Sequence, residues 1–185
     1  MSADTFRPMR RARQAMNPNA TIHLLQTTTG GVLSLVGDNG YPYGVPLTHV
    51  YLADAEQSGE HVPDLSASSG RLYFHSAVAG HKIDAIAGGC KACYTVIARD
   101  FVDSARLTTL FESVVVFGRV RRVVDEDEKR RALEALAQRY APQEENSKHN
   151  ESEITRHWDS TAVLAFDIEH MSGKVARELL PKDAS

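Results

Sequence analysis

The amino-acid sequence predicts a mainly β domain, a small β-barrel with a few added helices. Six segments carry the alternating or β-branched pattern of strands, and the longest covers residues 108–124. The tripeptide Asp38-Asn39-Gly40 is typical of a hairpin turn, because asparagine and glycine tolerate a positive φ. Residues 125–140 show the clearest helical pattern. Antiparallel-looking hairpins, with one short helix between two strands, fit a small barrel with helical additions.

Length, composition and charge are ordinary for one globular domain. The chain has 185 residues, 42% apolar and 24% charged, so we expect one domain over 1–185, with an N-terminal arm over 1–16 and a C-terminal tail over 175–185. A net charge of −3 offers no general attraction to nucleic acid. No apolar run approaches the roughly 20 residues that cross a bilayer, and the N-terminus lacks the apolar core of a secretory signal. A cytoplasmic protein with no nucleic-acid or membrane partner is expected.

A short helix is predicted near the N-terminus. Asn17 can accept a hydrogen bond from the first turn, and Pro18 suits the first helical position. The helix is therefore expected over 18–26, with Gly30-Gly31 ending it.

A hairpin follows this helix. An apolar strand over 32–36 leads into the turn, and the return strand covers 41–52. Pro42 and Pro46 cannot donate ladder hydrogen bonds, so the return strand must lie at a sheet edge or be irregular near its middle. The polar residues 53–69 are expected to form a loop.

The central stretch consists of a strand, a short helix and a second strand. Residues 71–75 alternate polar and apolar, and residues 93–97 are β-branched and aromatic. Between them, Gly80-His81-Lys82 begins the helix and Gly88-Gly89 closes it.

The start of this central helix has the character of an anion site. A turn through small residues into a helix leaves free backbone N–H groups at the positive end of the helix dipole. His81 and Lys82 are poor choices there for helix stability, but they suit a bound phosphate as additional donors. A solvated turn with merely exposed basic residues explains this stretch, taken alone, about equally well.

The strand predicted over 108–124 is apolar on both faces, which indicates burial on both sides or contact with a partner on one side. One face carries Val114, Val116, Val120 and Val124, and the other carries Val115, Phe117 and Val123. The remaining elements of this half are a loop over 101–107, a helix over 125–140, a charged loop over 143–152, a short turn over 154–158 and a final strand over 161–168.

Cysteine occurs only at Cys90 and Cys93, so no disulfide framework is implied. Their C-x-x-C spacing could mark a redox pair or half of a zinc site. No second ligand pair accompanies them, and residues three apart on a strand face opposite ways. We therefore expect no metal site, and we interpret Cys93 as a small core residue.

Four blocks of the sequence occur in the order and at the spacing of a known family. They are Tyr41-Pro42-Tyr43-Gly44-Val45-Pro46-Leu47-Thr48, Tyr73-Phe74-His75-Ser76-Ala77, Gly80-His81-Lys82 and Glu112-Ser113-Val114-Val115-Val116-Phe117-Gly118. Together they closely resemble the nitroimidazole-resistance (Nim) branch of the pyridoxamine 5′-phosphate oxidase-like flavoproteins. The resemblance covers about residues 9–174, and residues 53–69 depart from it as an insertion.

The resemblance implies an FMN-binding split barrel that works as a homodimer, with two sites at the interface. The phosphate would lie against Gly80, His81 and Lys82, and the partner subunit would contribute Glu112, Ser113 and Trp158. The full set implied to bind FMN is Val45, Pro46, Leu47, Thr48, Phe74, His75, Ser76, Ala77, Gly80, His81, Lys82, Glu112, Ser113 and Trp158.

Some of these residues keep a second interpretation. His75 is the candidate catalytic residue, because an imidazole near a flavin can pass protons at neutral pH, but one histidine without a visible partner is poor evidence for catalysis, which favours a role only as a hydrogen-bond donor to the cofactor. Trp158 can instead be a core or interface aromatic. Residues 45–48 can be an ordinary edge strand.

The function implied is an FMN-dependent oxidoreductase. It would take electrons from a donor such as NAD(P)H and reduce a small-molecule substrate such as a nitroaromatic compound, with the flavin supplying the chemistry. A module that binds flavin, heme or a deazaflavin without turnover is the alternative from another class. True pyridoxamine 5′-phosphate oxidation is disfavoured, because the tail lacks the arginine-rich substrate segment of that enzyme.

Overall fold

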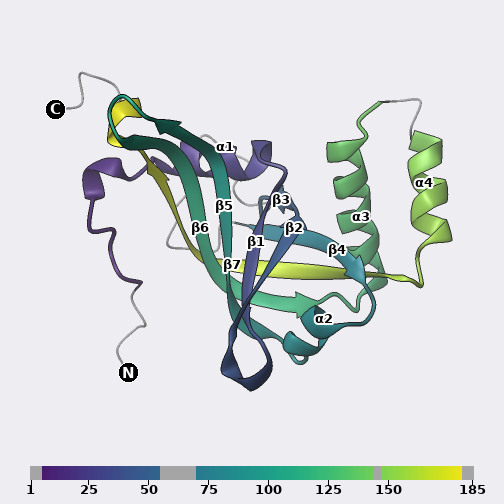
Figure 1. Ribbon diagram of the computed structural model, residues 1–185. Helices are drawn as coiled ribbons and strands as arrows, with labels where there is room; N and C mark the ends of the chain where they lie inside the picture. The colour runs from purple at the N-terminus through teal and green to yellow at the C-terminus, as the bar shows by residue number, and fades with distance from the viewer. Residues whose placement is uncertain (1–5, 55–69, 144–146, 181–185) are drawn as a thin grey trace.

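A computed structural model describes residues 6–54, 70–143 and 147–180 of the chain (Figure 1). Among these residues, seven strands form one antiparallel sheet in the order β2-β1-β5-β6-β7-β4-β3. The strands are β1 (Gly30–Val36), β2 (Pro42–Thr48), β3 (Val50–Leu52), β4 (Arg71–Ala77), β5 (Cys90–Asp103), β6 (Thr108–Arg122) and β7 (Thr161–Val175). The helices are α1 (Pro18–Thr27), α2 (His81–Ala85), α3 (Glu126–Tyr140) and α4 (Ser147–Arg156), with single turns η1 (Ala12–Gln14), η2 (Asp38–Gly40) and η5 (Arg177–Leu179).

The sheet closes on itself at one residue. β2 and β3 stand at opposite ends of the strand order, yet only His49 separates them in the chain. The two edges of the sheet must therefore meet at His49, which makes the sheet a split barrel and confirms the predicted fold class. The prolines of residues 41–52 do lie on an edge strand, as predicted, but this segment forms two strands rather than one.

The predicted loop over 101–107 is too long, because residues 101–103 belong to β5 and only residues 104–107 form a turn. β5 continues to Asp103 and pairs with β6 from Cys90↔Val120 to Asp103↔Thr108, with one register shift between Ile97 and Arg99, so only a tight turn remains. This long hairpin projects beyond the barrel on the side away from α3 and α4 (Figure 1). When two neighbouring strands pair, both can continue beyond the residues that show an alternating polarity pattern. The pattern of a single sequence does not reveal this extension.

The first turns of α1 and α3 are capped as the sequence predicts, but the predicted end of α1 is wrong. Asn17 caps α1 by accepting the Ala20 amide at 2.8 Å, and Asp125 caps α3 by accepting the Glu128 amide at 2.7 Å. Gly30-Gly31 does not end α1, which stops at Thr27; both glycines belong to β1.

The predicted loop over 143–152 and turn over 154–158 are replaced by α4, which packs beside α3 (Figure 1). α4 carries few apolar residues, so the periodic signal that identifies a surface helix is weak. An ion pair within the helix joins Arg156 to Glu153 at 2.8 Å, and Arg130 of α3 lies 3.9 Å from Glu151. The predicted loop over 53–69 falls almost wholly outside the described residues.

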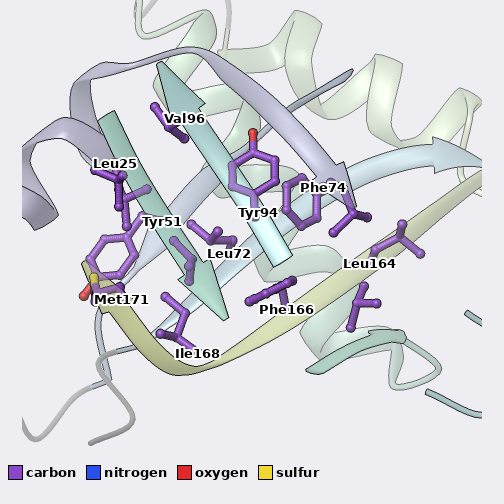
Figure 2. Close-up of a cluster of buried hydrophobic side chains, with 14 of the residues drawn as sticks. Leu25, Tyr51, Leu72, Phe74, Tyr94, Val96, Leu164, Phe166, Ile168 and Met171 are labelled. Carbon is purple, nitrogen blue, oxygen red and sulfur yellow. The ribbon is translucent and has the colours of Figure 1, made fainter. Parts of the chain in front are cut away.

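Two hydrophobic clusters fill the molecule. The larger lies inside the barrel, where Phe74 and Tyr94 pack side by side among leucines and valines (Figure 2). The second joins the sheet to α3 and includes Tyr73, Val163, Leu133 and Leu136.

β6 shows how the pattern of a strand can mislead. Val114, Val116 and Val120 are fully buried as one face, but Phe117 on the other face is 39% exposed and Val124 is 88% exposed. The register shifts between Phe117 and Gly118, and the strand ends at Arg122, so Val124 no longer shares the buried face. None of the described helices is long and apolar enough to span a membrane.

Candidate functional site

The connection from β4 through α2 to β5 forms the first part of the site. Gly80 precedes α2 with φ of 114°, a value that disfavours other residues, and its carbonyl accepts the amides of Ile83 at 2.7 Å and Asp84 at 3.2 Å. A Cβ built on Gly80 would meet no atom within 4 Å. The surface in front of this turn is therefore open. The first two amides of α2 precede its first hydrogen-bonded turn, so the helix itself offers them no acceptor.

A lysine and a serine face each other beside this turn. Lys82 donates its ammonium to the hydroxyl of Ser76, and that hydroxyl donates to the carbonyl of Ala77 at 3.0 Å. His75 and Ala77 are exposed at the same end of β4. Phe74, which was also expected in the site, is fully buried in the barrel core, so its side chain supports β4 from inside.

The His81 side chain is engaged with the β1–β2 hairpin. Its ring stacks on Tyr43 with centroids 4.1 Å apart, and its Nε2 lies 3.6 Å from a carboxylate oxygen of Asp38. A side chain at Gly37 would press on this ring, since a Cβ there would lie 3.2 Å from it. The hairpin is thus docked on α2 through His81, a contact that no sequence pattern indicated.

The second part of the site is the edge of β2. Val45 and Leu47 are half-buried and Pro46 and Thr48 are exposed, as strand alternation requires. The His49 amide reaches Thr29 on the β1 side at 3.4 Å. Because backbone groups alternate along a strand, those of Pro46 and Thr48 point to the other side, where β2 has no neighbouring strand in the described sheet.

An open groove of about 650 Å³ lies over the face of the sheet formed by β2, β1 and β5, with Pro46 and Thr48 of β2 in its lining. Val32 is 38% exposed and Ile97 is 62% exposed at the groove, so part of its wall is apolar. Its lining residues are Gly30, Gly31, Val32, Ser34, Pro46, Leu47, Thr48, Thr95 and Ile97.

Glu112 and Ser113 do not meet the α2 turn within one chain. Ser113 pairs with Ile97, seven residues along β5 from Cys90, the residue at which that strand leaves α2. At about 3.3 Å per residue this places Ser113 roughly 23 Å from the start of β5.

Trp158 packs against α3. The Lys129 ammonium lies 4.3 Å from the centroid of the Trp158 ring and donates to the Trp158 carbonyl at 2.6 Å. The side chain also packs on the cluster between the sheet and α3. Within one chain, the interpretation of Trp158 as a packing aromatic fits this geometry.

Sequence reasoning missed a buried polar group behind β2. Tyr94 of β5 donates its hydroxyl to the Leu47 carbonyl at 2.8 Å, and the same hydroxyl lies 3.0 Å from Nδ1 of His49. Both side chains are fully buried. The only available signal was a polar residue where β2 and β3 divide, and the strand pattern alone gave it no role.

The cysteines show no sign of activation. Burial raises the pKa of both the Cys90 and the Cys93 thiol, so they stay protonated near neutral pH. Across the described parts of the chain, no three His, Cys, Asp or Glu side chains gather as a metal site.

Comparison with known proteins reveals the family. Residues 18–175 match the sequence profile of the pyridoxamine 5′-phosphate oxidase family. A search of curated proteins finds no match.

Solved structures share the fold at low sequence identity. A 5-nitroimidazole antibiotic resistance protein of Bacteroides thetaiotaomicron, assigned that role provisionally, is 20% identical over 87% of this chain and 86% of its own, with a TM-score of 0.64. A flavocytochrome of Azotobacter vinelandii is 22% identical over 98% and 79%, with a TM-score of 0.67. An FAD- and heme-binding protein of Mycobacterium smegmatis is 22% identical over 89% and 74%, with a TM-score of 0.65. The profile match covers most of the chain, and the chain therefore belongs to the pyridoxamine 5′-phosphate oxidase family.

Proposed function

We propose that this protein binds FMN and reduces a small electrophile such as a nitroaromatic compound. The observation that carries the proposal is a pair of complementary surfaces. A cationic and hydroxyl donor set at Lys82 and Ser76 lies at one end, and a partly apolar groove over β2, β1 and β5 lies at the other. Tyr43 stacks on His81 and so marks the α2 surface on β2, and Leu47 lines the groove four residues further along the strand. About 13 Å of strand therefore separates the two surfaces. The phosphate, ribityl chain and ring of FMN together span such a distance.

The residues present fit a phosphate at α2. An ammonium group has three donors, so Lys82 can keep Ser76 and still donate to a phosphate oxygen. The open surface at Gly80 leaves the amides of His81 and Lys82 accessible as further donors. The His81 ring is occupied by Tyr43 and Asp38, so we assign its contribution to the backbone.

The residues of the β2 edge fit the ring. The carbonyl of Pro46 and the amide of Thr48 face the unpaired side, and they offer an acceptor next to a donor. The pyrimidine side of a flavin carries the matching groups, an N–H between two carbonyls. When bound, FMN supplies the electron and hydride transfer, and the protein supplies binding and orientation.

We assign proton transfer to His75. Its imidazole is exposed at the end of β4, next to Ser76, where it can donate a proton to a reduced substrate. Its second role, as a hydrogen-bond donor to the cofactor alone, uses the same position. A pH profile of the His75→Asn variant separates the two, because loss of a general acid changes the profile and loss of a donor changes affinity.

We further propose a homodimer in which the partner's Glu112, the partner's Ser113 and the partner's Trp158 complete each site. The support is the exposure of apolar side chains on the sheet and on the β5–β6 hairpin that projects from it: Val32, Ile97, Phe101, Val102 and Phe117. Sedimentation of the purified protein tests this assembly, and a monomer at micromolar concentration contradicts it.

The first test is the absorption spectrum of the purified protein, with the released cofactor identified by mass. Flavin bands with about one FMN per chain are expected. The flavin should then be reduced by a donor such as NAD(P)H and reoxidised by a nitroaromatic. Reduced flavin that ignores every nitroaromatic offered contradicts the substrate assignment.

Lys82→Ala tests the phosphate position. Loss of a charge-assisted hydrogen bond should weaken FMN binding by about 1.5–3 kcal/mol, measured by quenching of flavin fluorescence. Lys148→Ala, which removes an exposed lysine on α4, is the matched control and should bind FMN like the parent. Equal affinity of both variants would move the phosphate elsewhere.

A second candidate is a module that binds flavin, heme or a deazaflavin without turnover. The described site holds no paired acid and base beyond His75, and two proteins of the same fold are a flavocytochrome and an FAD- and heme-binding protein. Steady turnover with any donor and acceptor counts against it. Peroxide release with pyridoxamine phosphate would instead favour true oxidase activity, which the tail disfavours.

A further inference from the structure

The hydroxyl of Tyr94 lies at the point where the barrel closes. It donates to the Leu47 carbonyl at 2.8 Å, and the backbone of Gly31 interacts with the phenolic oxygen and partly offsets the rise that burial causes in the pKa of Tyr94. The phenol can reach this position because residue 31 has no side chain: a Cβ there would lie 2.8 Å from the Tyr94 ring and 2.4 Å from the Thr95 carbonyl. Gly31, Tyr94 and Leu47 therefore form one contact that joins β1, β5 and β2.

His49 holds this hydroxyl from the other side. Its Nε2 lies 2.8 Å from the Leu25 carbonyl, which can only accept, so Nε2 carries the proton. Nδ1 then carries a lone pair and can only accept, so the single Tyr94 O–H is shared between the Leu47 carbonyl at 2.8 Å and Nδ1 at 3.0 Å. The neighbours of His49 are Arg139, which also donates to the Leu25 carbonyl at 3.2 Å, and Tyr140, which donates to the His49 carbonyl at 2.6 Å.

The direction of the Leu47 carbonyl decides what β2 offers at its free edge. A trans peptide is planar, so its C=O and the next N–H point in opposite directions. With the Leu47 carbonyl held toward Tyr94, the Thr48 amide must point away from β1, to the unpaired side of the strand. Thr48 is also one of the residues that line the groove described above.

We propose that Tyr94, oriented by His49, is a positioning residue that fixes the Leu47–Thr48 peptide and so aims the Thr48 amide at the ring of the bound cofactor. This inference rests on the proposed function, since it assigns the groove to the flavin. Tyr94 does not touch the cofactor, because its side chain is fully buried on the core side of β2. Its effect reaches the ring only through the backbone.

The test compares Tyr94→Phe with Tyr73→Phe. Both variants lose one buried phenolic hydroxyl, and that of Tyr73 donates to Glu128 at 3.0 Å, away from β2. Tyr94→Phe should raise the dissociation constant for FMN about five- to tenfold, the usual effect of one neutral hydrogen bond, and should shift the visible flavin bands. Tyr73→Phe should leave both unchanged at a similar loss of thermal stability. His49→Gln provides a second variant, with a smaller shift in the same direction.

A measurement without cofactor separates this inference from the proposed function. The carbonyl ¹³C resonance of Leu47 in the FMN-free protein should move in Tyr94→Phe and stay in Tyr73→Phe, because it reports the hydrogen bond directly. A parent protein that binds no FMN overturns the proposed function, and with it the role of Tyr94 in aiming the Thr48 amide at the flavin ring. A parent that binds FMN, with Tyr94→Phe unchanged in affinity, spectrum and Leu47 resonance, overturns the positioning role alone.

Discussion

Two polar clusters brace the same sheet, one inside the barrel and one outside it. The inner polar cluster consists of Leu47, His49 and Tyr94 and contains no formal charge at neutral pH. Burial lowers the pKa of His49 to about 4 and raises that of Tyr94 well above its usual value, so both stay neutral. Because burying a charge is costly, an interior junction is built from neutral hydrogen bonds.

The outer charged cluster fastens α3 to the sheet with ions. It consists of Arg71, Tyr73, Arg121, Glu128 and Asp167. Arg121 donates to both oxygens of Glu128, at 2.7 and 3.0 Å, and lies 3.3 Å from Asp167. Its guanidinium lowers the pKa of Glu128, the opposite of what burial alone would do. Partial exposure to water makes paired charges tolerable here.

The comparison predicts that acid weakens the inner polar cluster first. Folded His49 holds its proton less tightly than unfolded histidine, so the unfolded state takes up more protons between pH 6.5 and about 4. The free energy of unfolding should therefore fall through this window as pH falls, by on the order of 3 kcal/mol in total. Glu128 affects stability at lower pH than His49, because its stabilising effect is present above pH 4.5 and is lost only below it.

Urea unfolding of the parent and of His49→Gln between pH 7 and pH 4.5 measures this effect. The variant should show a flatter dependence on pH. Burial also lowers the pKa of His170, so its titration changes the free energy of unfolding in the same direction as that of His49. His170→Gln therefore serves as the control. Equal slopes for the parent and His49→Gln would contradict the assignment.

A smaller loss of unfolding free energy is expected when the outer charged cluster is disrupted. Arg121→Met removes both guanidinium bonds from Glu128, whose side chain is only 14% exposed, but Tyr73 still donates to it. Loss of about 1–2 kcal/mol of unfolding free energy is expected at pH 7, after allowing for screening by solvent. Added salt should destabilise the parent more than the variant, as followed by thermal unfolding. A salt response shared by both proteins would show that the ions contribute little.

The smallest effect should come from the exposed pair of Arg119 and Glu169. Their atoms lie 3.1 Å apart, but the side chains are 57% and 38% exposed. Arg119→Ala should change the unfolding free energy by less than about 0.5 kcal/mol in urea titrations. A loss as large as that of Arg121→Met would mean that exposure does not set the difference between the clusters.

Much of the site could be predicted because its parts are local in sequence. The β4–α2 turn, with Ser76, Gly80 and Lys82, lies within seven residues, and the Lys82 ammonium donates to the Ser76 hydroxyl. The engagement of His81 with Tyr43 could not be predicted, since it joins residues 38 apart in the chain. Whether Glu112, Ser113 and Trp158 reach the site depends on a second chain, which stays a prediction.

The sequence by itself determined the local elements: the caps at Asn17 and Asp125, the hairpin turn at Asp38-Asn39-Gly40 and the edge position of the prolines. Capping, positive φ and missing amides act between neighbours, so short patterns reveal them. Only the tertiary structure decided that β2 and β3 divide at His49, that α4 forms and that Tyr94 meets Leu47, 47 residues away. These features depend on the closure of the barrel, which brings distant residues together and buries them against one another.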